Sequence, residues 1–409
     1  MFNALKITTT SAIASAAIHS FADELLSHGE HCGVIFEALA ADPDCAIAQA
    51  CAGALFLTKL TRDGNAQAAP RLAAAKALAH YASPREQQVI AAIIAWGNRQ
   101  EMRAIRLLRG VVEAWPHDLV AAKFCQILEL GTGDITGMVR TSAMAASVDD
   151  RTGFALGLHA FALEQAGNAR LAGRFGRRAI EINPARDPWA QHAVAHAFAA
   201  RGMPVEGRAF LHAHAQDWTR CSSFMLTHNW WHLALFGLEL NGADAALELY
   251  DSRVWGVRKN HAQDQINAIS LLTRLEMHGV DAGNRWDDLA FHIAPRAEDG
   301  INGFLDLHYV QALARAGYDR ATETMLRRLA GGECVTSAVA RGVVAHARGR
   351  YFEAAAALGP VRSQLGLIGG SNIQRETFAL IFADSLMRAR LVYDRPLVTP
   401  EYAAERRYA

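Results

Sequence analysis

The sequence predicts an all-α protein in which helical hairpins stack into an α-α superhelix. Apolar residues recur at a spacing of three to four along nearly all of the 409 residues, which is the period of an amphipathic helix. Only 11 prolines occur, and runs of β-branched residues are short, so little of the chain favours strands. Small residues also return at fixed places in successive segments. This self-similarity favours a regular stack of hairpins over one irregular helical bundle.

The repeating unit has the form of a tetratricopeptide-like hairpin. Such repeats are about 34 residues long, with small residues where two helices cross and a small residue in the turn between them. In residues 153–184, Ala160 and Ala172 take the crossing positions and Gly167 takes the turn. Four later segments keep this phase (188–211, 227–250, 303–326 and 335–358), and their turn residues are Gly202, Asn241, Gly317 and Gly349. Segments 32–60 and 84–117 predict two more hairpins.

We expect a single solenoid over residues 1–409, because no Gly/Ser-rich or single-charge linker interrupts the chain. Its weakest join lies near residues 131–150, where GTGDITGMVRTS (131–142) has the composition of a loop. The first helix is expected near residues 11–25, after a Thr/Ser cap. Its predicted buried face consists of Ile13, Ala16, Ala17, Phe21 and Leu25.

Composition excludes several classes of partner. The 41 Lys and Arg residues balance 41 Asp and Glu residues, which argues against binding to nucleic acid or to an acidic membrane surface. No segment reaches the roughly 20 apolar residues needed to span a bilayer. The six cysteines form no C-x-x-C pair, which favours a reducing, cytoplasmic setting without disulfides. Composition leaves the oligomeric state open, a homo-oligomer included.

Histidines carry the clearest functional signal. The chain has 17, and two neighbouring predicted hairpins each hold a pair at i, i+4: His192 with His196, and His228 with His232. This spacing places two imidazoles on one face of a helix, one turn apart. Counted back from the turn residue of each repeat, all four fall at positions that line the inner groove of such superhelices.

The same count adds residues to the predicted groove. Glu164, Trp231, Glu239 and His308 fall at groove positions, whereas His159 falls at a packing position. Near the C-terminus, Arg375 lies in the first turn of a predicted helix that begins with a Ser371–Gln374 capping-box pattern. A helix N-terminus with an added guanidinium suits a carboxylate or phosphate, although an ordinary cap explains the same pattern.

Two chemical roles are open for these residues. As a metal site, the two H-x-x-x-H pairs supply candidate ligands for a divalent ion such as Zn²⁺: His192, His196, His228 and His232. As an active site, with or without metal, His196 and His232 would act as acid and base beside Glu239, in a hydrolase or lyase.

A third role involves binding alone, without a reaction or a metal. The groove would bind a small polar ligand or peptide, which is a frequent use of a solenoid groove. The residues expected to line it are His192, His228, Trp231, Glu164, His308 and Arg375. We expect this role. The competing hypotheses are the enzyme, the metal site, a protein-interaction scaffold and a purely structural role in which the histidines bond one another in a filled interior.

Several phrases of the sequence occur together in a recognisable order. They are W-x-x-H-x-x-A-H at 189–196, HNWWHLALF-x-LE at 228–239, ALELYD at 246–251, SLLTRLEMHGVDAGNRWDDLA at 270–290 and GGS-x-x-QR at 369–375. Together they resemble the tetratricopeptide repeat protein 38 family over nearly the whole chain. The resemblance implies an α-solenoid without an assigned reaction, and it supports the two histidine pairs and His308 as motif positions. The sequence departs from the family pattern at Asn267, where Asp is usual, and at Leu305 and Asn372.

Overall fold

The computed structural model describes residues 5–148, 152–332 and 334–389, and within these ranges the fold is all-α. Their only β-type pairing is one isolated bridge between Gly29 and Cys221. The fold class predicted from the sequence is therefore confirmed. None of the described helices is long and apolar enough to cross a membrane. All six cysteines are free, in agreement with their spacing.

The helices form two compact units, one comprising Met1–Ala197 with Ala213–Leu226, the other Phe198–His212 with Thr227–Ala409. The segment 131–150 lies inside the first unit. That unit holds the helices α1 (Ala12–Leu26), α2 (Ile35–Ala41), α3 (Ala46–Leu57), α4 (Arg62–Leu78), α5 (Pro84–Gly97), α6 (Glu101–Ala114), α7 (Leu119–Thr132), α8 (Ile135–Ala146), α9 (Phe154–Gln165) and α10 (Ala169–Ile182).

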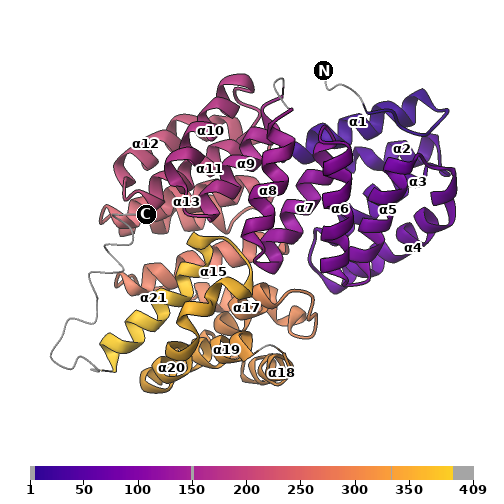
Figure 1. Ribbon diagram of the computed structural model, residues 1–409. Coiled ribbons are helices and arrows are strands. Elements are labelled where there is room, and N and C mark those ends of the chain that lie inside the picture. The colour runs from indigo at the N-terminus through magenta and orange to yellow at the C-terminus, as the bar shows by residue number, and fades with distance from the viewer. Residues whose placement is uncertain (1–4, 149–151, 333, 390–409) are drawn as a thin grey trace. The chain divides into compact units, whose positions relative to one another are not determined.

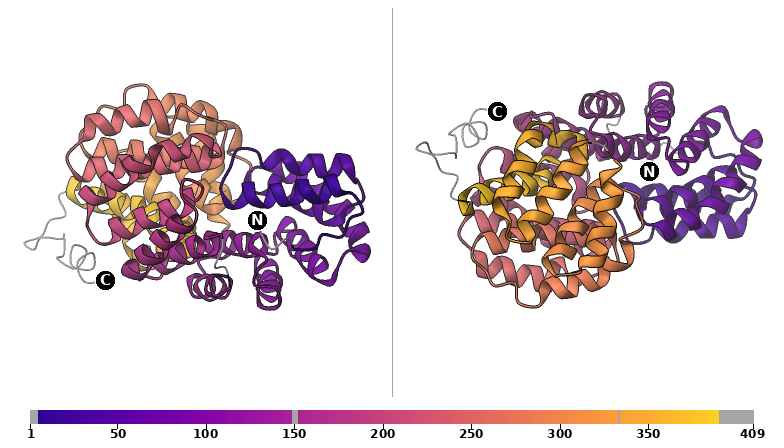
Figure 2. Two further views of the ribbon diagram at one scale, coloured as in Figure 1. Left: turned by 90° about the horizontal axis from the view of Figure 1, so that it is seen from above. Right: turned by 90° about the horizontal axis from the view of Figure 1, so that it is seen from below.

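Three helices contribute residues to both units: α11 (Pro188–Ala200), α12 (Pro204–His214) and α13 (Ser223–Glu239). The second unit continues with α14 (Ala243–Leu249), α15 (Ala262–Met277), α16 (Arg285–Ile293), α17 (Gly303–Arg315), α18 (Asp319–Ala330), α19 (Cys334–Ala347), α20 (Tyr351–Leu358) and α21 (Asn372–Arg388). Short 3-10 segments and one π-helical turn, Tyr250–Val254, join some of them. In Figures 1 and 2, helices α3 to α8 lie side by side in sequence order.

The turns between paired helices lie where the repeat frame predicts them. Gly167, Gly202, Gly317 and Gly349 all have positive φ, between 63° and 84°. Asn241 takes the same conformation with φ 62°, which Asn tolerates better than most residues. Each follows the first helix of its hairpin, so these turn residues end that helix and reverse the chain.

Small residues allow the paired helices to approach closely. A Cβ added at Gly207 of α12 would lie 2.4 Å from Cζ of Phe236 on α13. One added at Gly342 of α19 would lie 2.5 Å from Cγ of Leu358 on α20. Both glycines take crossing positions of the repeat, so the small-residue pattern has a steric cause.

Two local predictions were wrong. Helix α1 does begin after a Ser11 cap, but it buries Ala14, Ala17, Ile18, Phe21 and Leu26 and leaves Ile13 68% exposed. The predicted loop 131–142 is mostly helix: Gly133 ends α7 in the left-handed conformation, and the side chain of Asp134 caps α8. Gly133 and Asp134 therefore serve helix ends and not a long connection.

Each unit also contains contacts between segments far apart in sequence. In the first unit, the backbone N–H of Ser222 donates to the carbonyl of His28 at 2.7 Å, and α1 packs against α7. In the second unit, the last helix α21 packs against α15, where Arg274 donates to Thr377 and to the carbonyl of Ile373. Both contacts tie a terminal helix, or the loop beside it, to a distant part of the same unit.

Candidate metal centre

Helix α11 carries the first histidine pair. It begins at Pro188, directly after Asp187, whose Oδ1 accepts from the N–H of Ala190 at 2.8 Å. Proline suits this first position because its missing N–H would have no partner inside the helix. One turn apart on this helix, His192 and His196 have ring centroids 4.5 Å from each other. Both side chains are at most 1% exposed.

A buried carboxylate orients His196. Oε2 of Glu164, on α9, lies 3.0 Å from Nδ1 of His196, and the amide of Gln165 donates to the same carboxylate. Because a carboxylate accepts hydrogen bonds, the imidazole proton belongs on Nδ1 and the lone pair on Nε2. A carboxylate on the far nitrogen of a histidine is the usual outer partner of a metal ligand.

Helix α13 carries the second pair in a similar arrangement. His228 and His232 have ring centroids 4.8 Å apart, and Trp231 stacks on His228 with an interplanar angle of 15°. Nδ1 of His228 lies 2.9 Å from Oδ1 of Asn267, on α15. The amide oxygen accepts from this nitrogen, so His228 also presents its Nε2 lone pair. A residue outside the two motifs thus fixes one ring of each pair.

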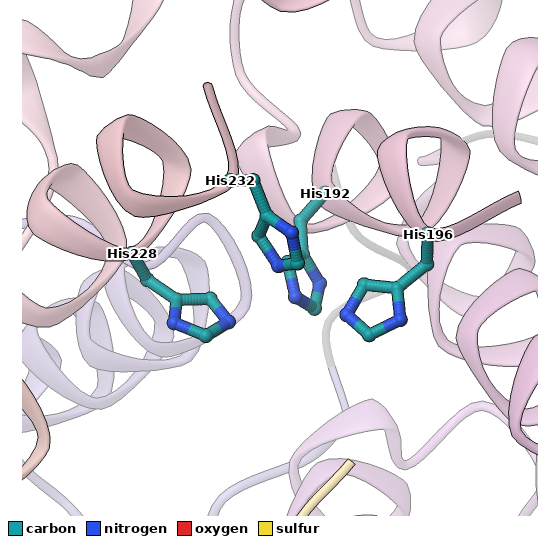
Figure 3. A group of neighbouring side chains, drawn as sticks. All are labelled: His192, His196, His228 and His232. Carbon is teal, nitrogen blue, oxygen red and sulfur yellow. The ribbon is translucent and has the colours of Figure 1, made fainter. Parts of the chain in front are cut away.

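The four imidazoles lie together. One ligand nitrogen from each lies within 4.8 Å of the other three, and all four side chains are buried. Figure 3 shows His192 and His196 on one helix and His228 and His232 on another, with the four rings close together. Nitrogens around a tetrahedral Zn²⁺ with bonds of 2.0–2.1 Å lie about 3.3 Å apart. Side-chain adjustments on the order of 1 Å would bring this group to that geometry.

The other predicted site residues have different environments. Trp231 is fully buried and packs between the two histidines of its own helix. Glu164 takes the supporting position described above. Glu239 is the last residue of α13 and is exposed, and its role beside the imidazoles stays a prediction. His159, predicted to pack, is buried and bonds the hydroxyl of Ser142.

His308 and Arg375 serve local structure. His308 is 1% exposed between Phe304 and Phe378, and its Nδ1 donates to the carbonyl of Phe304 at 2.9 Å. Burial lowers the pKa of His308 to about 4, which keeps the ring neutral. Arg375 donates to the carbonyl of Gly370 and to Asn372 Oδ1, at the start of its own helix. The predicted Ser371–Gln374 capping box is present, so the cap explains this motif.

Sequence reasoning missed one buried cation. Lys123 of α7 is 3% exposed, with Nζ 2.7 Å from Nε2 of His28 and 3.9 Å from the ring centroid of Trp189. Its signal was available, because a lysine interrupts the otherwise apolar stretch LVAAKFCQIL at 119–128. Nothing in the sequence places His28 beside it, since 95 residues separate the two.

The solved structures to which this chain is similar are distant in sequence. No protein-family model matches this chain. It is similar to the human IFIT1 dimer with PPP-AAAA at 14% identity, covering 80% of each chain with a TM-score of 0.42. It is also similar to the P58(IPK) TPR domain (13% identity, 93% of this chain and 96% of that one, TM-score 0.24). A third similar structure is Naa15/Naa10 bound to HypK-THB (12%, 96% and 65%, TM-score 0.28).

Proposed function

We propose that this chain binds one divalent transition-metal ion through His192, His196, His228 and His232. The observation that carries this proposal is the convergence of four buried imidazoles, with ligand nitrogens within 4.8 Å of one another. Imidazole suits Zn²⁺, Cu²⁺ and Ni²⁺, and four nitrogens meet the coordination number that Zn²⁺ prefers in structural sites. Under this proposal, the metal ion is the small ligand that the sequence analysis expects in the histidine-lined groove.

The surroundings of the four rings support a metal over a peptide. A peptide needs accessible surface, whereas these side chains are at most 3% exposed. The acceptors on Nδ1 of His196 and Nδ1 of His228 both turn Nε2 inward as the ligand atom. A hydrolase or lyase would need a base beside the centre, and the predicted base Glu239 is exposed. We therefore favour binding over catalysis.

We further propose membership of the tetratricopeptide repeat protein 38 family. The phrase HNWWHLALF-x-LE at 228–239 supports it, since it holds two of the four proposed ligands in a pattern more specific than a generic repeat. Under this proposal, the histidine pairs of the family motif would be the metal ligands. The Asn267 departure would then change the outer partner of His228 from a carboxylate to an amide.

The test is metal analysis of the full chain without a histidine tag. We expect about one Zn²⁺ per chain after dialysis against zinc, and a tetrahedral absorption spectrum after Co²⁺ substitution. His196→Ala and His232→Ala should each abolish stoichiometric binding. His212→Ala is the matched control, because His212 is exposed on α12 and should leave binding unchanged. Failure of the wild-type chain to bind any of Zn²⁺, Co²⁺, Ni²⁺ and Cu²⁺ at stoichiometry would overturn the proposal.

A further inference from the structure

Lys123 is unusual among the lysines of this chain. The sequence holds five, at positions 6, 59, 76, 123 and 259, and Lys123 is the one that is buried. It lies in the second turn of α7, a helix whose remaining buried residues are mostly apolar. Arginine is the usual cation elsewhere in the chain, so a buried primary amine at this point has a chemical character that no neighbour shares.

Two side chains define the surroundings of the amine. Nε2 of His28 lies 2.7 Å from Nζ of Lys123, which places an acceptor lone pair directly against the amine. The ring of Trp189 lies 3.9 Å from Nζ, measured to its centroid, and stacks on His28 at 5.1 Å. The amine thus has a proton acceptor beside it and an aromatic surface next to it.

Burial gives this amine an unusual protonation state. It lowers the pKa of Lys123 from 10.5 to about 7, because an ammonium loses its hydration there, and attraction to Asp187 offsets only part of this effect. An ordinary lysine is almost wholly protonated at neutral pH, and only the neutral amine is nucleophilic. A larger share of Lys123 than of an ordinary lysine therefore carries the neutral, nucleophilic amine near pH 7.

We propose that Lys123 is a second reactive site, where its amine condenses with a small uncharged aldehyde to form an imine while His28 transfers the protons. The site is distinct from the proposed metal centre and does not depend on metal. The aldehyde has to be small because the amine is 3% exposed. It has to be uncharged because the aromatic neighbours do not solvate a charge and Asp187 repels an anion.

The reaction balances without an added oxidant or reductant. The Nζ lone pair forms a bond to the carbonyl carbon, and the C=O π electrons move to oxygen. Nε2 of His28 takes one proton from the nitrogen and delivers it to that oxygen, which gives a carbinolamine. The second N–H proton then reaches the hydroxyl, which departs as water while the C=N bond forms. One amine and one aldehyde give one imine and one water.

The experiment traps the imine on the full chain. Propionaldehyde and sodium cyanoborohydride at pH 7, followed by digestion and mass spectrometry, report propylation at each lysine separately. We expect Lys123 to react at least about tenfold faster than the other four, which serve as internal controls, because its neutral fraction is far larger. Modification of the other four lysines with Lys123 untouched would overturn the proposal, and this outcome needs no variant.

Variants separate the role of His28 from folding. His28 has a positive φ of 52°, so His28→Asn removes the imidazole and keeps a residue that accepts this backbone. We expect at least a fivefold slower reaction at Lys123, because the residue that transfers the protons is gone; an unchanged rate would remove His28 from the reaction. Lys123→Met should show no adduct at position 123. Wild-type protein stripped of metal with EDTA should retain full reactivity, which distinguishes this site from the metal centre.

Discussion

The carboxylate of Glu164 orients the ring of His196. It accepts from Nδ1 across 3.0 Å inside the protein, where an uncompensated charge is costly. A metal on Nε2 would draw electron density from the ring, and the carboxylate would stabilise that shift. Glu164→Gln keeps an oxygen for the hydrogen bond and removes the charge. We expect zinc affinity to fall by about 10- to 100-fold, measured by competition with a chromophoric chelator. Unchanged affinity would show that Glu164 only fills space.

Asn267 provides the opposite test at His228. Its amide oxygen accepts from Nδ1 at 2.9 Å, in a position where the resembling family usually has Asp. Asn267→Asp would place a carboxylate there, with the hydroxyl of Thr227 close enough to donate to it. We expect zinc to bind about tenfold more tightly, while the metal-free protein melts at a lower temperature because it buries an extra charge. Weaker zinc binding in the same competition assay would contradict this expectation.

The pKa of Lys123 links its burial to stability. Below about pH 7 both the folded and unfolded chains hold its proton, so it adds no pH dependence there. Between about pH 7 and 10.5 the unfolded chain binds more protons than the folded one. The free energy of unfolding therefore rises with pH through this window, by at most about 1.4 kcal/mol per pH unit. The measurement is urea unfolding from pH 7 to pH 10, and Lys123→Met should lack this increment. Equal slopes for both proteins would contradict the shifted pKa.

The four histidines were predictable from the sequence because spacing fixes which residues share a helical face. Their partners were harder to predict. Glu164 came from the same positional count, but that count also chose Glu239, which is exposed at the end of α13. A repeat position predicts the direction in which a side chain points from the helix axis, and it does not predict whether that side chain is buried. Asn267 and Lys123 act from other helices, beyond the reach of a pattern within one motif.

At the scale of the element, a glycine inside a helix is required only where a neighbouring helix leaves no room for a Cβ atom. Gly207 lies at a close crossing, where an added Cβ would meet the ring of Phe236 at 2.4 Å. Gly207→Ala should therefore lower the free energy of unfolding by about 1–3 kcal/mol. A Cβ added at Gly110, inside α6, would make only an ordinary contact with Gln88 Oε1 at 3.8 Å, and Gly110→Ala should raise the free energy of unfolding by about 0.5–1 kcal/mol. Denaturant unfolding measures both. A stabilised Gly207→Ala chain would mean that the crossing relaxes.

Helix boundaries were predicted best where turn chemistry is strict. Gly167, Gly202, Asn241, Gly317 and Gly349 all adopt the left-handed conformation that ends a helix. The same chemistry misled at 131–142, where Gly133 and Asp134 form a two-residue junction and helix continues on both sides. A glycine of this kind predicts where one helix ends, and the residues around it do not predict how short the loop to the next helix is. The predicted face of α1 was right at Ala17 and Phe21 and wrong at Ile13, because α1 packs against both α2 and the distant α7, and the repeat pattern does not predict the second contact.

At the scale of the whole molecule, the sequence predicts which hairpins pack against the next one, and it does not predict contacts between segments far apart in the chain. In a repeat array each hairpin contacts the next, so periodic residues report on nearest-neighbour packing. The contact of His28 with Ser222, and of α15 with α21, joins segments that repeat phase cannot relate. These closures create the environments of Lys123 and Arg274, and a pattern within one repeat does not reveal either environment.

A metal held by two helices should stabilise the folded chain as a whole. Its four proposed ligands come from α11 and α13, and unfolding either helix would release the ion. Free Zn²⁺ at 100 times its dissociation constant adds about 2.7 kcal/mol, which for a chain of this length raises the melting temperature by on the order of 3 °C. Calorimetry at pH 7.5 should show this rise for the wild type and for His212→Ala, and none for His232→Ala. At pH 5 protons compete for imidazoles whose ordinary pKa is about 6.5, so the rise should vanish. A rise that persists at pH 5, or in His232→Ala, would place the stabilising zinc elsewhere on the chain.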